Sequence, residues 1–186
     1  MGIYIVAMGA LFFLAFAFFA VGQATNVRSK AQTAADSAAL AAARQNRDEV
    51  KIAFLQALNT GNSDILGQLL NDAGTDDGAA CQAARQYAGD NRATVRQCER
   101  VGSGVGYTVS VITDDTVGSS VIDGTESKHA EATATAVVEP RCSLGTDAKS
   151  GHTMRFTCDG GPMTIDPSAQ GFTLDLSDFY SVHLSK

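Results

Sequence analysis

The chain begins with an uninterrupted apolar segment. From Ile3 to Val21 every residue is apolar, aromatic or Gly, and the first charged side chain is Arg28. A helical run of about 20 apolar residues matches a hydrocarbon core about 30 Å thick. The pattern therefore predicts a helix that can span a membrane through residues 3–21.

An alanine-rich segment follows without a helix breaker, because no Pro or Gly occurs between Gly22 and Gly61. Ala recurs at i, i+3, i+4, i+7, i+8 and i+11, the spacing of one helix face. These positions are Ala31, Ala34, Ala35, Ala38, Ala39 and Ala42. Ala favours helix and lets neighbouring helices approach closely. We expect one rod of roughly 55 residues, about 80 Å long, whose Ala face packs against neighbouring helices.

Aromatic and small side chains are interspersed within the apolar segment. The Phe side chains cover all sides of the predicted helix, which supplies packing all round in a bundle. Association of apolar helices depends on close packing, because transfer from lipid to protein gains little hydrophobic energy. We therefore expect packing contacts in an assembly from Gly9, Phe12, Phe13, Phe16 and Phe19.

After Gly61 the pattern changes to short helices and strands. Apolar spacing and turn residues predict helices over residues 65–72 and 78–88. Alternating apolar and polar positions predict strands over residues 94–101, 107–113, 119–122, 129–139, 154–158, 163–165, 172–176 and 179–184. The expected fold class is α+β, with a long N-terminal helix over residues 1–60 and a small, mostly antiparallel β-rich domain over residues 61–186.

Charge is divided unequally along the chain. Residues 1–61 carry five Lys/Arg and three Asp/Glu, whereas residues 62–186 carry nine and seventeen. Phosphate binding needs a basic face. The acidic second part therefore argues against a nucleic-acid partner and indicates a surface exposed to solvent.

Four cysteines lie behind the apolar segment: Cys81, Cys98, Cys142 and Cys158. They form no Cys-x-x-Cys, and no His lies at a zinc-finger spacing, so we expect no metal site. An even number of cysteines in this position indicates an oxidising compartment. Of the three possible pairings, we favour the sequential one, which closes two short loops. Free structural thiols are the alternative.

No motif for catalysis or cofactor binding is evident. The glycine-rich residues 102–106 lack the Lys-Ser/Thr of a phosphate loop. The Asp pairs at positions 76–77 and 114–115 do not follow the EF-hand pattern, and no Gly-x-Ser-x-Gly is present. The histidines at 129, 152 and 183 are isolated. We therefore expect neither enzymatic activity nor a cofactor.

Asp36 interrupts the alanine-rich stretch. An assembly of packed helices would partly desolvate its carboxylate, and a buried carboxylate needs a cation or several donors. Candidate cations are Arg28 and Lys30 of an adjacent subunit, or the Met1 amino group of a chain displaced along the axis. In the alternative, Asp36 faces water beside Ser37.

The charges that flank the apolar segment are unusual for an exported domain. Met1 to Tyr4 contain no Lys or Arg, whereas Arg28 and Lys30 follow the segment. Positive residues normally mark the cytoplasmic side of a membrane helix, which conflicts with paired cysteines. Removal of a basic leader ahead of Met1 resolves the conflict, so we expect the numbering to start at a processed N-terminus. The alternative is an ordinary signal peptide cleaved near residues 22–24.

The apolar segment and the alanine-rich block together resemble the N-terminal region of TadE/TadG-like proteins of the Tad (Flp) pilus system, a branch of the type IV pilin superfamily. The family block Ala-Ala-Asp-x-Ala-Ala-Leu-Ala-Ala is matched by Ala34, Ala35, Asp36, Ala38, Ala39, Leu40, Ala41 and Ala42. The resemblance is close over residues 1–43 and loose to residue 139. The chain departs from type IV pilins in having Ile5, and no acidic residue before Asp36, where pilins carry a glutamate.

The resemblance implies a pilin, a structural subunit that polymerises through its N-terminal helix. Such a subunit waits in the cytoplasmic membrane and is cut by a prepilin peptidase. An ATPase-driven platform then moves it into an extracellular filament of copies of itself on the cell surface. The alternatives are a minor TadE/TadG-like pseudopilin and a single-pass membrane-anchored extracellular binding domain. A small Ala face beyond the bilayer favours polymerisation, because a plain anchor has no use for it.

Overall fold

A computed structural model describes residues 2–71, 74, 76–101, 105–116, 118, 126–150 and 153–185, with side chains 20, 23, 24 and 146–150 excepted. The strand predicted at 119–122 and His152 lie outside these residues. The helices are α1 Gly2–Glu49, α2 Lys51–Thr60, α3 Ser63–Asn71, α4 Asp77–Asp90 and the 3-10 helix η1 Leu176–Asp178. The strands are β1 Ala93–Arg100, β2 Gly106–Thr116, β3 His129–Pro140, β4 Cys142–Ser150, β5 Thr153–Cys158, β6 Gly161–Ile165 and β7 Tyr180–Leu184. The predicted α+β class is confirmed.

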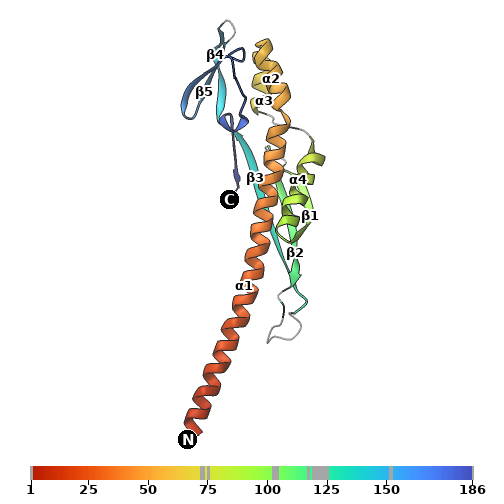
Figure 1. The fold of residues 1–186 in the computed structure, drawn as a ribbon, viewed down its shortest axis with the longest axis vertical. Helices are drawn as coiled ribbons and strands as arrows, with labels where there is room; N and C mark the ends of the chain where they lie inside the picture. Colours follow the sequence, from red (N-terminus) through yellow and green to blue (C-terminus); the bar gives the residue numbers. More distant parts are fainter. Residues whose placement is uncertain are drawn as a thin grey trace.

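The first helix dominates the shape of the molecule. Its N-terminal half extends away from all other labelled elements, whereas its C-terminal half lies alongside β3 and α4 (Figure 1). The predicted rod to residue 60 is interrupted at one residue, because α1 ends at Glu49 and α2 begins at Lys51, with Val50 between them. Val50 and Phe54 are buried, with exposed fractions of 6% and 0%. Val50 keeps right-handed helical φ and ψ of −78° and −2°, and its carbonyl accepts a 2.8 Å hydrogen bond from the Phe54 amide, so the interruption is only one residue long.

A four-stranded antiparallel sheet packs against the C-terminal half of α1. Its strand order is β1-β2-β3-β7. One face presents Tyr107, Val109 and Val111 from β2, and Ala134, Ala136 and Val138 from β3, all of them buried. Period-2 alternation places these side chains on one face, where they join the α1 alanines in one hydrophobic core.

The six alanines at the predicted spacing are fully buried in the chain itself, each with an exposed fraction of 0%. All of them except Ala31 belong to a core to which α4, β2 and β3 also contribute. Small side chains on α1 let the sheet and α4 approach its backbone closely. The expectation that this face packs against neighbouring subunits is therefore corrected: its partners are elements of the same chain. The core also crosses the predicted boundary between residues 60 and 61.

A second sheet of three strands, ordered β4-β5-β6, joins the core at the α2 end of the molecule. Phe54 of α2 meets Phe156 of β5 and Phe179, with ring centroids 6.4 and 4.8 Å apart. The rings of Phe156 and Phe179 lie 5.1 Å apart in an edge-to-face arrangement. This aromatic cluster ties the second sheet to α2.

In this region one predicted strand is wrong, and one observed strand is not predicted. Residues 172–176 form no strand; Asp175 accepts a 2.8 Å hydrogen bond from the Ser177 amide and starts η1. An Asp side chain that bonds the backbone two residues ahead favours a turn over a strand. Strand β4 was not predicted, because its sequence CSLGTDAKS lacks apolar alternation. Pairing with β5 determines its conformation.

The favoured cysteine pairing is confirmed. Cys81 of α4 is bonded to Cys98 of β1, with Cα atoms 5.9 Å apart. Cys142 of β4 is bonded to Cys158, its register partner on β5. No cysteine is free, so the free-thiol alternative is wrong. The two bonds tie α4 to the first sheet and close the β4–β5 pair.

Candidate functional site

The most prominent surface of the molecule is the bare N-terminal half of α1. Residues Gly2–Phe19 are long and apolar enough to cross a membrane, and none of them is buried. The exposed fractions of Phe13 and Phe18 are 73% and 77%. An apolar surface of this length requires lipid or another protein to cover it. The candidate functional site is therefore this segment.

The structure divides the predicted assembly residues into two groups. The first group lies on the bare segment, where the exposed fractions of Phe12, Phe16 and Phe19 are 62%, 59% and 64%. A Cβ added at Gly9 would meet nothing within 4 Å. The second group is the alanine face, which the core of the same chain covers. Of these two groups, only the first is free to contact another copy.

Asp36 lies at the rim between α1 and the first sheet. Its carboxylate is partly buried and accepts a 2.8 Å hydrogen bond from Nε2 of Gln32. It lines a groove of about 470 Å³ together with Gln32, Thr133, Ala134, Thr135, Leu184 and Ser185. Of the described lining residues, Asp36 is the only one that ionises. Neither of the two predicted cations, Arg28 and Lys30, is an ion-pair partner of Asp36 within the chain.

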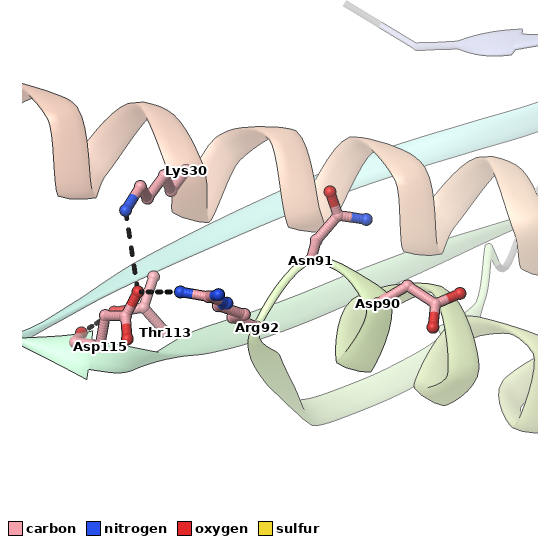
Figure 2. Close-up of a pocket in the computed structure, with 6 residues that line it drawn as sticks. All are labelled: Lys30, Asp90, Asn91, Arg92, Thr113 and Asp115. Atoms are coloured by element: carbon pink, nitrogen blue, oxygen red, sulfur yellow. Dashed lines mark hydrogen bonds and ion pairs between the residues drawn. The ribbon is translucent and has the colours of Figure 1, made fainter.

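Lys30 already has an acidic neighbour in its own chain. Its Nζ lies 3.7 Å from Oδ2 of Asp115, and Nη1 of Arg92 lies 3.9 Å from the same oxygen (Figure 2). These residues line a small pocket with Asp90, Asn91 and Thr113. Nearby, Nδ2 of Asn91 donates 3.1 and 2.8 Å hydrogen bonds to Oγ of Ser37 and the carbonyl of Tyr87. The contacts of the residues that line this pocket therefore hold the α4–β1 turn against α1.

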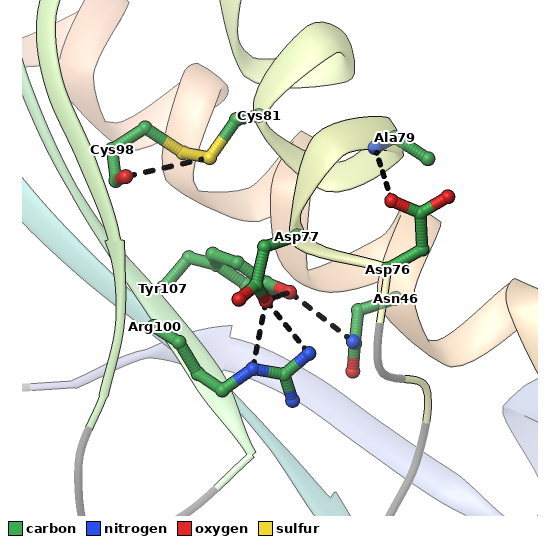
Figure 3. The surroundings of a disulfide bond; sticks show 8 residues. All are labelled: Asn46, Asp76, Asp77, Ala79, Cys81, Cys98, Arg100 and Tyr107. Atoms are coloured by element: carbon green, nitrogen blue, oxygen red, sulfur yellow. Dashed lines mark hydrogen bonds and ion pairs between the residues drawn. A yellow bond between two sulfur atoms is a disulfide. The ribbon is translucent and has the colours of Figure 1, made fainter.

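A polar network that no sequence pattern indicated joins α1, α4 and the first sheet (Figure 3). The Tyr107 hydroxyl donates to Oδ1 of Asp77 at 2.7 Å, and Nε of Arg100 donates to the same oxygen at 2.8 Å. Nδ2 of the fully buried Asn46 donates to the Tyr107 oxygen at 3.3 Å. These residues are 31 to 61 positions apart from Asn46, so no local motif could identify the network.

Hydrogen bonds determine the electrostatics of this network. The Tyr107 hydroxyl, and then Arg100, lower the pKa of the Asp77 carboxyl. Burial, and then the hydrogen bond to Asp77, raise the pKa of Tyr107. Both shifts favour an ionised Asp77 beside a neutral Tyr107, which is a structural arrangement that anchors the start of α4. Among the described residues, no group of three His, Cys, Asp or Glu side chains could hold a metal ion.

We predict that Tyr107→Phe will lower the free energy of unfolding by about 1–3 kcal/mol at pH 7. The folded chain holds the pKa of Asp77 below its unfolded value of about 3.9. The ionised Asp77 therefore stabilises the fold above that pH, and this stabilisation is lost as the pH falls through the lower, folded-state pKa. The difference between wild type and variant should therefore shrink as the pH falls below about 4. Urea denaturation of the full chain in detergent measures it. An equal difference at every pH would contradict this assignment.

Comparison with known proteins bears on the N-terminal segment alone. A protein-family model described as "Tad: Putative Flp pilus-assembly TadE/G-like" matches residues 1–45. The match covers the bare segment and the whole alanine face, about a quarter of the chain. No curated protein and no solved structure matches the chain. The match supports a link of this N-terminal segment to the Tad pilus system, whose components of this family are structural rather than enzymatic proteins. Together with the apolar helix, it indicates membrane anchoring and a pilus-related extracellular location.

Proposed function

We propose that this chain is a pilin-like subunit that polymerises through the bare segment of α1 into an extracellular Tad-type filament. The observation that carries the proposal is the division of α1 into a bare apolar half and a half embedded in the domain core. Because α1 is continuous from Gly2 to Glu49, moving the apolar half from lipid into a helical bundle moves the domain with it. One rigid element thus serves the membrane and the filament.

Gly9 favours a packed bundle over a plain lipid anchor. Gly costs about 1 kcal/mol relative to Ala in a helix interior, and a Cβ at Gly9 would meet nothing in its own chain. The cost is explained if another helix approaches at this position, since small residues permit close contact between apolar helices. The Phe side chains around Gly9 then supply the packing area.

The proposed pilin-like role also implies where the chain lies and which proteins act on it. Before assembly the chain would lie in the cytoplasmic membrane with its disulfide-bonded domain on the oxidising side. The resemblance implies maturation by a prepilin peptidase and movement by an assembly ATPase and its platform. The filament itself consists of copies of this chain. A minor pseudopilin would contribute few copies to each filament, so counting subunits per filament distinguishes it from a main subunit.

The test compares fibres from cells that produce wild type, Gly9→Leu or Gly89→Leu. Gly89 is the matched control, because it is also a helical glycine with nothing within 4 Å of an added Cβ. Sheared fractions are imaged by electron microscopy, and the N-terminus of the chain in them is sequenced. We expect wild type and Gly89→Leu in thin fibres, and at least a tenfold lower yield for Gly9→Leu at an equal membrane level.

Two outcomes would count against the proposal. Wild-type chain that stays in the membrane and never enters fibres would favour the anchored binding domain. Full fibre yield from Gly9→Leu would show that close helix packing at this position does not drive assembly.

A further inference from the structure

The charged residues of α1 fall into those that are paired within the chain and those that are not. Lys30 lies against Asp115, and Nη2 of Arg47 lies 2.8 Å from Oδ1 of Asp48. Glu49 accepts hydrogen bonds of 3.1 and 3.2 Å from the Asp76 amide. Within the part of the chain that the structure describes, the charged side chains of α1 that have neither an ion pair nor a hydrogen bond to another element are Arg28, Asp36 and Arg44.

These three unpaired charges are available to a partner. Arg28 and Arg44 are exposed, and Asp36 is partly buried at a groove whose other described lining residues are uncharged. A carboxylate in such a groove attracts a cation from outside the chain. Within the described part of the chain, its carboxylate accepts a hydrogen bond from the side-chain amide of Gln32, which is a neutral donor. A cation from another copy can therefore still form a charge-assisted bond with it.

The spacing of the three residues is regular. Asp36 follows Arg28 by eight residues, and Arg44 follows Asp36 by eight. Eight helical residues rise about 12 Å. Eight residues also make about 2.2 turns of the helix. Arg28 and Arg44 therefore lie about 80° from Asp36 around the helix axis, on opposite sides of it. The long, flexible Arg side chain can span a rotation of this size.

We propose that Asp36 forms ion pairs with Arg28 and Arg44 of adjacent copies, which fixes an axial offset of about 12 Å between them. The inference rests on the proposed function and specifies the axial register between adjacent copies in the filament. In a parallel pair with this offset, Arg28 of the upper copy lies level with Asp36 of the lower one. In the same pair, Asp36 of the upper copy lies level with Arg44 of the lower one.

Other registers are disfavoured by the same charges. With no offset, each of the three residues faces its own counterpart, and like charges repel. At about 24 Å, or sixteen residues, Arg28 of the upper copy lies level with Arg44 of the lower one. Apolar and small side chains pack similarly in several registers, whereas like-charge contacts discriminate strongly between them. The bare segment therefore supplies attraction, and the three charges supply register.

Charge reversal tests the pairing. We expect Asp36→Arg alone, and Arg28→Asp with Arg44→Asp, each to reduce fibre yield at least tenfold. The triple variant, which reverses all three charges, should restore fibres. Gln45→Asp is the control, because Gln45 is exposed on the same helix beside Arg44 and should retain wild-type yield. Membrane level and the absence of free thiols verify that each variant folds.

Cross-linking measures the offset directly. Chains carrying Arg28→Cys and chains carrying Asp36→Cys are co-produced as minorities in wild-type chain, and fibres are treated with a flexible thiol-to-thiol cross-linker about as long as an Arg side chain, because a direct disulfide would need closer Cα atoms. This pair should cross-link at least fivefold more than Arg28→Cys with Gln32→Cys, which reports an offset of about 6 Å. Wild-type fibres that cross-link equally or better with Gln32→Cys, or a triple variant without fibres, would overturn the register but not polymerisation. Absence of wild-type fibres would overturn the proposed function itself.

Discussion

Replacing Phe54 with Ala will lower the free energy of unfolding by about 3–5 kcal/mol. Phe54 is fully buried and contacts the rings of Phe156 and Phe179. Its removal leaves a cavity where α2 meets the second sheet, and that cavity adds to the lost transfer free energy. Loss of the ring contacts adds to the cost. The fold at this end of the molecule therefore depends on one side chain from the short helix after Val50.

The measurement is chemical denaturation of the full chain in detergent, followed by circular dichroism. Phe13→Ala is the matched control, because Phe13 lies on the bare segment and is 73% exposed. We expect the control to change the stability of the domain by less than about 0.5 kcal/mol. If both variants lose the same free energy, or neither loses any, the aromatic cluster is not the anchor of the second sheet.

Periodicity predicted the elements whose pattern is strong. The apolar segment and the alanine spacing predicted α1, and period-2 alternation predicted β1, β2, β3 and β7 close to their observed bounds. Prediction failed where tertiary contacts determine the conformation. The segment β4 is a strand because β5 pairs with it. Propensity summed along a sequence does not contain this contact.

The sequence identified the bare segment as the candidate site, and it singled out Asp36 and Arg28. It could not assign a partner to the alanine face, because a stripe of small residues accepts a sheet as readily as another helix. Arg44 carried no local signal, since an isolated exposed Arg is ordinary on a helix. Its significance follows from the contacts that pair Lys30 and Arg47 within the chain.

Ala38→Leu will separate the two roles that an alanine face can have. Ala38 is fully buried within the chain, so a larger side chain overpacks the interface of α1 with its own domain. Overpacking of a filled core costs about 1–3 kcal/mol. We expect a loss of this size in detergent, where no filament exists, accompanied by a lower fibre yield because fewer domains are folded.

Thr33→Leu is the matched control for this experiment. Thr33 is exposed on α1, and its hydroxyl donates a 3.0 Å hydrogen bond to the Ser29 carbonyl of the same helix. A leucine there has room in the isolated chain, so its stability should change by less than about 0.5 kcal/mol. Suppose instead that Ala38→Leu abolishes fibres while leaving the unfolding free energy unchanged. The alanine face would then contact neighbouring copies, and packing between copies, rather than packing against the sheet of the same chain, would require a small side chain at position 38. If Ala38→Leu loses stability and Thr33→Leu does not, the fold of the single chain constrains the alanines. Contacts between copies are then made by the bare segment and by the unpaired charges that follow it along α1.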